Sequence, residues 1–296
     1  MSRFMLLVIA LFFALVTPRA FAVQTVDLTP YLQAEVNEVA TLNAQVNYLQ
    51  QQADPISAGV VASYIPDHQM MVNLLSAQIT AMGGNPTSVV PTGTPFLGTK
   101  QAIFNNDMTA HANVVNTYQD LAKNTDPTIN RLAMIGWNGA ARHFSSLQFA
   151  LASTTNTPTS THDGLFAALI LERTAIADLQ TQSARLSQLG DTANANKLMA
   201  LIPRHQTQAS MLMTQISQLG WDPATAVAPP VVAFDTSNQI LTSERIINTQ
   251  LVNSYAMAIY SQPANSPLQM AAMQTQPVAL AALNSLFGVQ VVARTA

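Results

Sequence analysis

The most informative absence from this 296-residue chain is cysteine, of which it has none. Without cysteine the protein has no disulfide and no lipid-anchored cysteine, so packing alone must hold its fold together. Charged residues are also scarce, at 9% of the chain, whereas 49% of the residues are hydrophobic. This content is ample for a packed core, and the length suggests about two domains at the usual ~100–200 residues each.

Long apolar runs are absent except at the amino end. There Arg3 precedes an apolar stretch at 4–16, and residues 20–22 provide the small residues of a cleavage site. This pattern predicts a signal peptide over residues 1–22. Since the run is shorter than the ~20 residues of a transmembrane helix, we expect a mature protein that does not span a membrane and is periplasmic or secreted.

Basic residues are too few for a nucleic-acid interface. Removal of residues 1–22 would take away Arg3 and Arg19, two of the 12 basic residues, and none of the 15 acidic ones. The mature chain would then carry 10 basic and 15 acidic residues, a net charge of −5. Because nucleic-acid binding depends on clusters of Lys and Arg, this balance argues against a nucleic-acid partner. The sequence identifies no protein partner, and it lacks a nucleotide-binding glycine loop.

An internal repeat organises the chain. When the sequence is shifted by 137 positions, residues 35–86 align with residues 172–223 without a gap and share 17 identities in 52 columns. Such a match indicates a tandem duplication. We expect copy one at 23–151, a polar linker at 152–162 and copy two at 163–296.

Apolar residues within each copy recur at helical spacing. In copy one they predict helices over about 32–49, 61–82, 104–122 and 126–151. Strand signals are nearly absent. A long connection joins the second helix to the third in each copy, and a crossover at that position is typical of the ferritin-like four-helix bundle. The sequence therefore predicts an all-α protein made of two tandem four-helix ferritin-like bundles.

A proline recurs in the second helix of both copies. Pro66 and Pro203 each lie two residues before a histidine on the apolar face. Two interpretations remain open. The proline either kinks the helix and aims the histidine, or a new helix begins at this point.

Ionisable residues on the predicted core face of copy one are the candidates for a functional site. Each helix places one of them there, and the four are Glu35, His68, His111 and His143. An ionisable side chain in a core costs several kcal/mol unless it is paired or binds a metal. One carboxylate with three imidazoles suits a divalent transition metal such as Fe, Mn, Zn or Cu. Nearby acids that could add a ligand or orient an imidazole are Glu38, Asp67 and Asp107.

Copy two has a weaker set of candidates. Glu172 and His205 persist, but Asn248 and Leu280 replace the histidines of the third and fourth helices. Glu244 is the only compensating acid. We therefore predict a degenerate second site at Glu172, His205 and Glu244.

Three functions remain compatible with these residues. The first is a non-enzymatic metal-binding protein in metal handling or envelope stress, and the second is a metal-dependent redox enzyme with an atypical centre. The third is a metal-free structural or interaction module, in which a buried histidine donates to a buried glutamate and satisfies both groups. The ordinary dinuclear ferritin pattern asks for Glu-x-x-His on two helices, but Ile65 and Ala140 occupy those glutamate positions.

Copy one resembles a family of exported bacterial ferritin-like domains of unknown function, often described as periplasmic or outer-membrane proteins. The matching stretches are 65–68, 107–111 and 142–147, which read Ile-Pro-Asp-His, Asp-Met-Thr-Ala-His and Arg-His-Phe-Ser-Ser-Leu. The resemblance covers about residues 30–151 and implies a four-helix ferritin-like fold with a metal site, without an established reaction. This chain departs from the family in its two copies and in its depleted second set of ligands.

Overall fold

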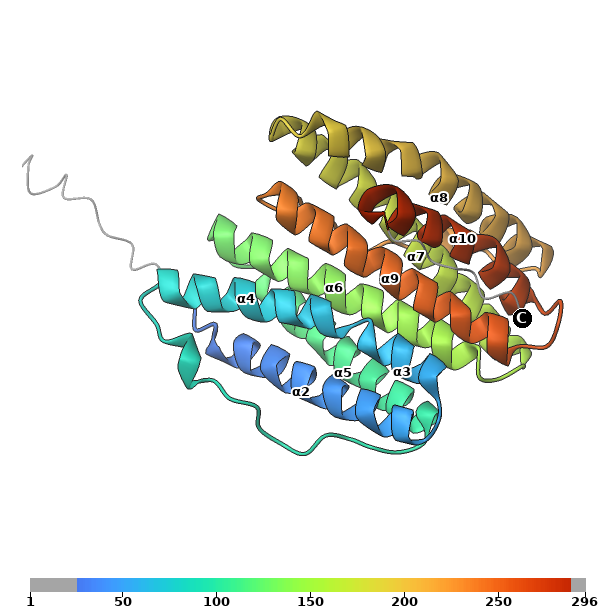
Figure 1. Cartoon of the computed structure of the whole chain (residues 1–296), viewed down its shortest axis with the longest axis horizontal. Coiled ribbons are helices and arrows are strands. Elements are labelled where there is room, and N and C mark those ends of the chain that lie inside the picture. The colour runs from blue at the N-terminus through green and yellow to red at the C-terminus, as the bar shows by residue number, and fades with distance from the viewer. Residues whose placement is uncertain (1–25, 289–296) are drawn as a thin grey trace, which may run out of the picture.

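Helices account for all the regular structure in the described part of the chain. The computed structural model describes residues 26–288, and no β-strand occurs in them. The predicted signal peptide at 1–22 lies outside the described residues. Figure 1 shows the helices packed side by side as a bundle. This arrangement confirms the all-α prediction.

A first group of helices spans residues 29–152. It consists of α2 (Thr29–Gln51), α3 (Pro55–Ala62), α4 (Ile65–Ala81), α5 (Lys100–Leu121) and α6 (Pro127–Ala152). Helix α2 packs against α3 and α4, and α5 packs against α6. The long connection from α4 to α5 contains only a 3₁₀ turn, η1 (Pro86–Ser88), and runs past α2 in Figure 1.

A second group of helices follows the same order. It consists of α7 (Pro158–Gln188), α8 (Thr192–Gln218), α9 (Ser237–Ser261) and α10 (Pro267–Phe287). Helix α7 packs against α8, and α9 packs against α10. The connection from α8 to α9 again contains a single 3₁₀ turn, η2 (Pro223–Thr225). This turn follows the second long helix of its group, as η1 follows α4 in the first group.

Capping residues set the helix boundaries. Asp126, the predicted N-cap of α6, accepts hydrogen bonds from the backbone N–H groups of Thr128 and Ile129. At the other end of a helix, Gly83 and Gly220 have φ values of +82° and +83°, in the left-handed region that favours glycine. They terminate α4 and α8 at equivalent positions of the repeat.

The two copies differ at the repeated proline. Helix α3 ends at Ala62 and α4 begins at Ile65, so Pro66 lies in the first turn of a new helix, where it disrupts no helical hydrogen bond. Pro203 instead lies inside α8, which continues through it. In copy one, the interpretation that a new helix begins at the proline is therefore correct.

The segment between the two groups is shorter than predicted. The expected linker covers 152–162, but α7 already begins at Pro158. Thr157 and Ser160 form a capping box, and proline suits the first helical position. The Ser, Thr and Pro residues that indicate a loop thus also begin a helix, and only 153–157 is non-helical.

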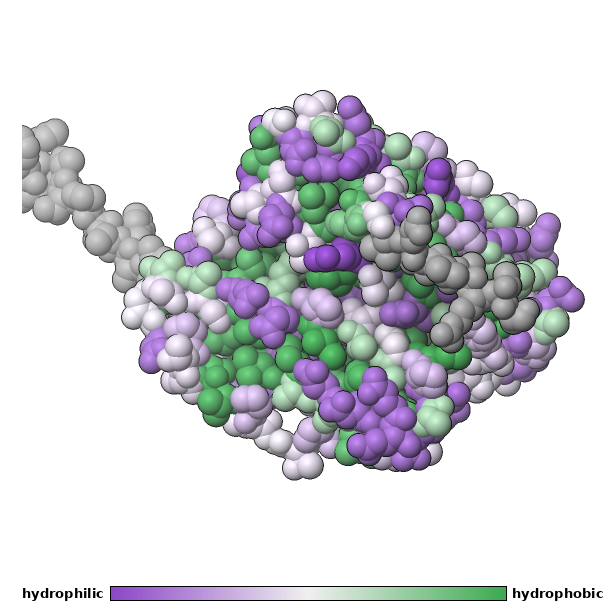
Figure 2. Space-filling view, in the orientation of Figure 1, coloured by the Kyte–Doolittle hydropathy of each residue, from purple (hydrophilic) through white to green (hydrophobic). Residues whose placement is uncertain are grey.

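The two groups share a buried interface. Helix α6 contacts α7 and α9, and α3 also contacts α9. Met257 of α9 packs in the core of the first group, and Phe149 of α6 packs edge-on against Tyr255 of α9. On the face shown in Figure 2, hydrophilic and hydrophobic side chains are mixed. Among residues 26–288 we find no helix whose length and hydropathy would let it cross a bilayer.

Candidate metal centre

Three histidines converge in the core of the first group. His68 comes from α4, His111 from α5 and His143 from α6, and each is at most 4% exposed. Nε2 of His111 lies 3.1 Å from Nε2 of His68 and 3.1 Å from Nδ1 of His143. One ring nitrogen from each histidine lies within 4.8 Å of the other two, so this buried cluster could hold a metal ion.

Glu35 holds the ring of His68 from its far side. Nδ1 of His68 lies 2.6 Å from Oε2 of Glu35, and the hydroxyl of Tyr118 donates to Oε1 of Glu35 at 2.6 Å. Both carboxylate oxygens are thus engaged. The structure places the predicted ligand Glu35 behind the cluster, where it orients an imidazole.

The rings of His111 and His143 are held in the same way. Nδ1 of His111 donates to the backbone carbonyl of Asp107 at 2.7 Å, and Nε2 of His143 lies 2.8 Å from Oδ2 of Asp67. Burial alone would raise the pKa of Asp67, but Arg142 and His143 hold that pKa well below its usual range. Asp67 therefore remains an ionised acceptor.

These outer contacts determine which ring atoms are free. Carboxylate and carbonyl oxygens only accept hydrogen bonds, so each neutral imidazole that donates to them carries its proton on the outward nitrogen. The inward nitrogens, Nε2 of His68, Nε2 of His111 and Nδ1 of His143, then present lone pairs to one another. Convergent lone pairs need a cation or a proton between them, and histidine binds transition metals in this form.

The separations of these nitrogens suit a small divalent ion. Metal–nitrogen bonds of ~2.0–2.1 Å in a tetrahedral site place two ligand atoms about 3.3 Å apart. The two observed nitrogen–nitrogen distances of 3.1 Å are close to this value. These two separations are therefore compatible with a shared ion, and the third pair of nitrogens lies within 4.8 Å.

Glu38 provides a carboxylate oxygen next to the cluster. Its Oε1 is buried, has no hydrogen-bond partner among the described residues and lies 3.9 Å from Nε2 of His111. Two atoms that each lie ~2.0–2.2 Å from one ion can be up to about 4 Å apart. Burial raises the pKa of Glu38 to about 7. This unpartnered oxygen fits a fourth ligand.

A proton can also occupy the cluster when no metal is bound. Burial lowers the pKa of His68, but Glu35 and other nearby carboxylates raise it, with a net result of about 9. Burial lowers the pKa of His143 to about 4 and that of His111 well below its usual value. The metal-free cluster thus carries its positive charge on His68.

The second group retains one part of this arrangement. Nδ1 of His205 lies 2.7 Å from Oε2 of Glu172, and the hydroxyl of Tyr255 donates to Oε1 of Glu172 at 3.0 Å. These contacts repeat those of the first group at the same offset of 137 positions. The duplication therefore extends to hydrogen bonds in the core.

The remaining candidates of the second group do not form a comparable cluster. Asn248 takes the place of the third-helix histidine, and its Nδ2 donates to the backbone carbonyl of Glu244 at 2.8 Å. Burial raises the pKa of Glu244 and of its neighbour Asp178. Across residues 26–288, the three histidines of the first group are the ones brought within reach of a common ion.

Two core residues next to the site were missed in the sequence, although the repeat contains a signal for them. Tyr118 aligns with Tyr255, and Gln45 aligns with Gln182. Nε2 of Gln45 donates to Oδ1 of Asp107 at 2.8 Å, and burial raises the pKa of Asp107 to about 6. Tyr255 repeats the contact of Tyr118 with a buried glutamate, whereas Gln182 donates to Asp178 and to the backbone carbonyl of Val232.

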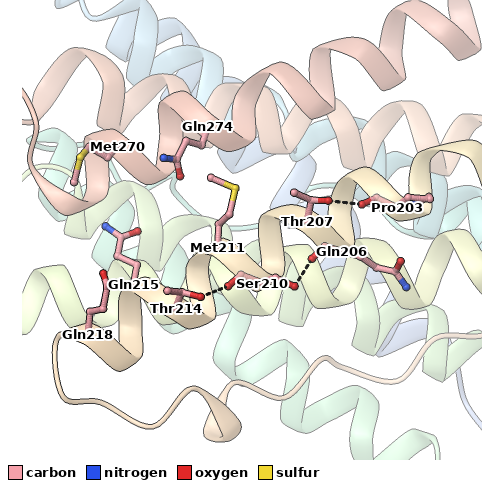
Figure 3. A pocket seen from close by; sticks show the side chains of 10 residues that line it. All are labelled: Pro203, Gln206, Thr207, Ser210, Met211, Thr214, Gln215, Gln218, Met270 and Gln274. Atoms are coloured by element: carbon pink, nitrogen blue, oxygen red, sulfur yellow. Dashed lines mark hydrogen bonds between the residues drawn. The ribbon is translucent and has the colours of Figure 1, made fainter.

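A wide groove lies apart from the cluster. It has a volume of about 780 Å³ between α8 and α10, and its lining is shown in Figure 3: Pro203, Gln206, Thr207, Ser210, Met211, Thr214, Gln215, Gln218, Met270 and Gln274. The hydroxyls of Thr207 and Ser210 already donate to backbone carbonyls one turn earlier. The lining residues are uncharged, and none of them is a predicted site residue.

Fold and site together define a helical protein with a buried three-histidine cluster that could bind a metal. Comparison with protein-family models, with curated proteins and with solved structures gives no match. The functional assignment therefore depends on the geometry of the cluster.

Proposed function

We propose that the protein binds one divalent transition metal ion, of the class Fe, Mn, Zn or Cu, through His68, His111 and His143. The observation that supports this most strongly is the direction of the ring nitrogens. Each ring has an oxygen acceptor behind it, so its neutral form directs a lone pair inward, and the three inward nitrogens converge. When bound, the ion would neutralise these lone pairs and connect α4, α5 and α6.

Glu38 completes the proposed ligand set. Three imidazoles and one carboxylate match the donor types that borderline divalent metals accept. Glu38 has a buried, unpartnered oxygen 3.9 Å from Nε2 of His111, whereas Glu35 has both oxygens engaged. In this proposal Glu35, Asp67 and the backbone of Asp107 hold the rings in place.

We also propose that the two groups of helices are tandem ferritin-like bundles of an exported protein. The long crossovers after α4 and α8, the repeated core contacts and the resemblance of residues 30–151 support the fold. The signal-like segment at 1–22 supports export. A periplasmic or secreted location would suit a role in metal handling or envelope stress.

A non-enzymatic role is the better supported one. The three histidines are at most 4% exposed, and an ion held by them and Glu38 would have four protein ligands, as in closed structural zinc sites. Direct binding of a substrate to the ion would require one ligand to leave. A redox role remains the second candidate, and it would have to operate by electron transfer through the protein.

Metal titration of the full mature chain tests the proposal. After removal of metal with a chelator, the protein should bind one equivalent of Zn²⁺ or Co²⁺ and unfold at a higher temperature in its presence. His68→Ala should abolish this stoichiometric binding, because it removes one of the three imidazole ligands. His205→Ala is the matched control in the second group and should leave binding unchanged. A chain that binds no metal and gains no thermal stability would contradict the proposal.

A further inference from the structure

The second group contributes one side chain to the ring of a proposed ligand. Gln250 of α9 is 1% exposed, and its Nε2 lies 3.0 Å from Nε2 of His143. Its Oε1 accepts from Nε of Arg142 at 2.9 Å, while its Nε2 donates to the carbonyl of Ser63 at 3.3 Å. If the amide were reversed, its N–H group would face the N–H donor of Arg142, and its oxygen would face the carbonyl oxygen of Ser63. Gln250 therefore presents an N–H group to His143.

Asp67 and Gln250 favour opposite protonation states of Nε2 of His143. The carboxylate of Asp67 accepts, so it favours a proton on Nε2 of His143 and a lone pair on Nδ1. The amide of Gln250 donates, so it favours a lone pair on Nε2 and a proton on Nδ1. Only the first tautomer lets Nδ1 bind a metal. The second instead directs an N–H group at Nε2 of His111, 3.1 Å away, and leaves no lone pair on Nδ1 for an ion.

This opposition requires both copies of the repeat. The residue aligned with Gln250 in copy one is Asn113, which is exposed on α5. The residue aligned with Asp67 in copy two is Arg204, which is exposed on α8. Neither copy alone contains the donor and the acceptor, so the arrangement is specific to the joined pair.

We infer that Gln250 of the second group opposes Asp67 at His143 and thereby weakens metal binding by the first group. Gln250 is a positioning residue, since it acts on the ion through the tautomer of His143. The second copy, which lacks the histidine triad, would then tune the release of the ion that the first copy binds. This inference rests on the proposed metal site.

Co²⁺ titration of the metal-free full mature chain tests the inference. Gln250→Glu keeps an acceptor for Arg142 and replaces the opposing donor, so it should bind Co²⁺ at least about threefold more tightly and release it more slowly to a chelator. Gln250→Met removes the donor without adding a charge and should also bind more tightly. Gln250→Met provides the test if the glutamate variant does not fold.

Two further variants complete the design. Asp67→Asn can place a donor where the acceptor was, and it should weaken Co²⁺ binding by about 10- to 100-fold. Asn253→Ala removes a neighbouring contact between the groups, in which Asn253 donates to the carbonyl of Gly59 at 3.1 Å. This control does not touch His143 and should leave the affinity unchanged.

A merely structural role of Gln250 predicts the opposite sign. Loss of the contact between the groups would then weaken Co²⁺ binding in both Gln250 variants. The inference is overturned if the wild-type chain binds one Co²⁺ and neither folded Gln250 variant binds it more tightly. If the wild-type chain binds no Co²⁺, the proposed function itself fails, which is a separate outcome.

Discussion

His111 is the central residue of the cluster, since its Nε2 lies 3.1 Å from a ring nitrogen of each of the other two histidines. Its counterpart Asn248 occupies the same position on α9 and makes the same type of hydrogen bond, to the backbone carbonyl four residues earlier. The two copies thus differ by an imidazole and an amide on equivalent helices. An amide offers no imidazole lone pair, so this difference removes one of the three candidate metal ligands.

Replacing His111 with the residue of copy two tests this comparison. His111→Asn should preserve the fold, because asparagine can still donate to the carbonyl of Asp107. Its affinity for Zn²⁺, measured by calorimetry, should fall by at least about a hundredfold, since an outer partner of a ligand alone contributes 10- to 100-fold. The matched control Asn248→Ala should bind Zn²⁺ like the wild type. Wild-type affinity in His111→Asn would contradict the role of this residue.

The affinity for metal should also fall as the pH falls. The metal displaces the proton of His68, whose pKa is raised to about 9 in the metal-free cluster. Below about pH 9 each bound ion therefore releases one proton, and the affinity should rise about tenfold per pH unit between about pH 7 and about pH 8.5. Below about pH 7 the carboxyl of Glu38 is protonated as well, so the dependence should become steeper if Glu38 binds the ion.

Calorimetry in buffers of different ionisation enthalpy counts these protons. Glu38→Gln should lower the affinity at every pH, because a ligand is lost, and should also remove the additional steepness below about pH 7. An affinity that stays constant from about pH 6 to about pH 9 would show that no proton competes with the ion.

At the scale of the elements, local signals in the sequence predicted the helices and their inward faces. Asp126 and Gly83 mark helix ends by capping, and the apolar period places the histidines on buried faces. The sequence did not predict which ring nitrogen faces its neighbours, because that depends on partners from distant helices. The hydroxyl of Tyr118 engages Glu35 from 83 positions away, which periodicity cannot reveal.

Gly136 allows the close packing of α5 and α6 on which Tyr118 depends. A Cβ atom at Gly136 would lie 2.5 Å from the ring of Tyr118. We expect Gly136→Ala to lower the free energy of unfolding by about 2 kcal/mol in urea denaturation, although alanine favours a helix by ~1 kcal/mol over glycine. Metal binding should weaken too, because Tyr118 supports Glu35.

Gly59 in α3 supplies the control for this substitution. A Cβ atom there would come no closer than 3.9 Å to Asn253. Gly59→Ala should therefore raise the free energy of unfolding by about 0.5–1 kcal/mol. A stabilising effect of Gly136→Ala would disprove the close contact between α5 and α6.

At the scale of the whole molecule, one chain contains a buried pair of glutamate and histidine in two different surroundings. In the second group, Glu172 and His205 bond to each other without any further imidazole. In the first group, the same pair is joined by two further histidines. The arrangement of the second group thus matches the metal-free interpretation considered for the whole sequence, whereas the cluster of the first group could hold a metal ion.

The buried interface between the groups should make the molecule unfold as one unit. The protein has two tryptophans, Trp137 on α6 and Trp221 directly beyond α8. In Trp221→Phe and Trp137→Phe variants, the fluorescence of the remaining tryptophan reports on one group. Because α6 packs against both α7 and α9, the two urea transitions should have the same midpoint. Separate midpoints would show that the groups unfold independently.

The most direct test of the central claim is anomalous diffraction from crystals of the mature protein loaded with Zn²⁺ or Co²⁺. The account predicts one strong peak per chain, ~2.0–2.2 Å from Nε2 of His68, Nε2 of His111 and Nδ1 of His143, with Glu38 within reach as the fourth ligand. No peak at the cluster, or a peak on the outward nitrogens of these rings, would contradict it.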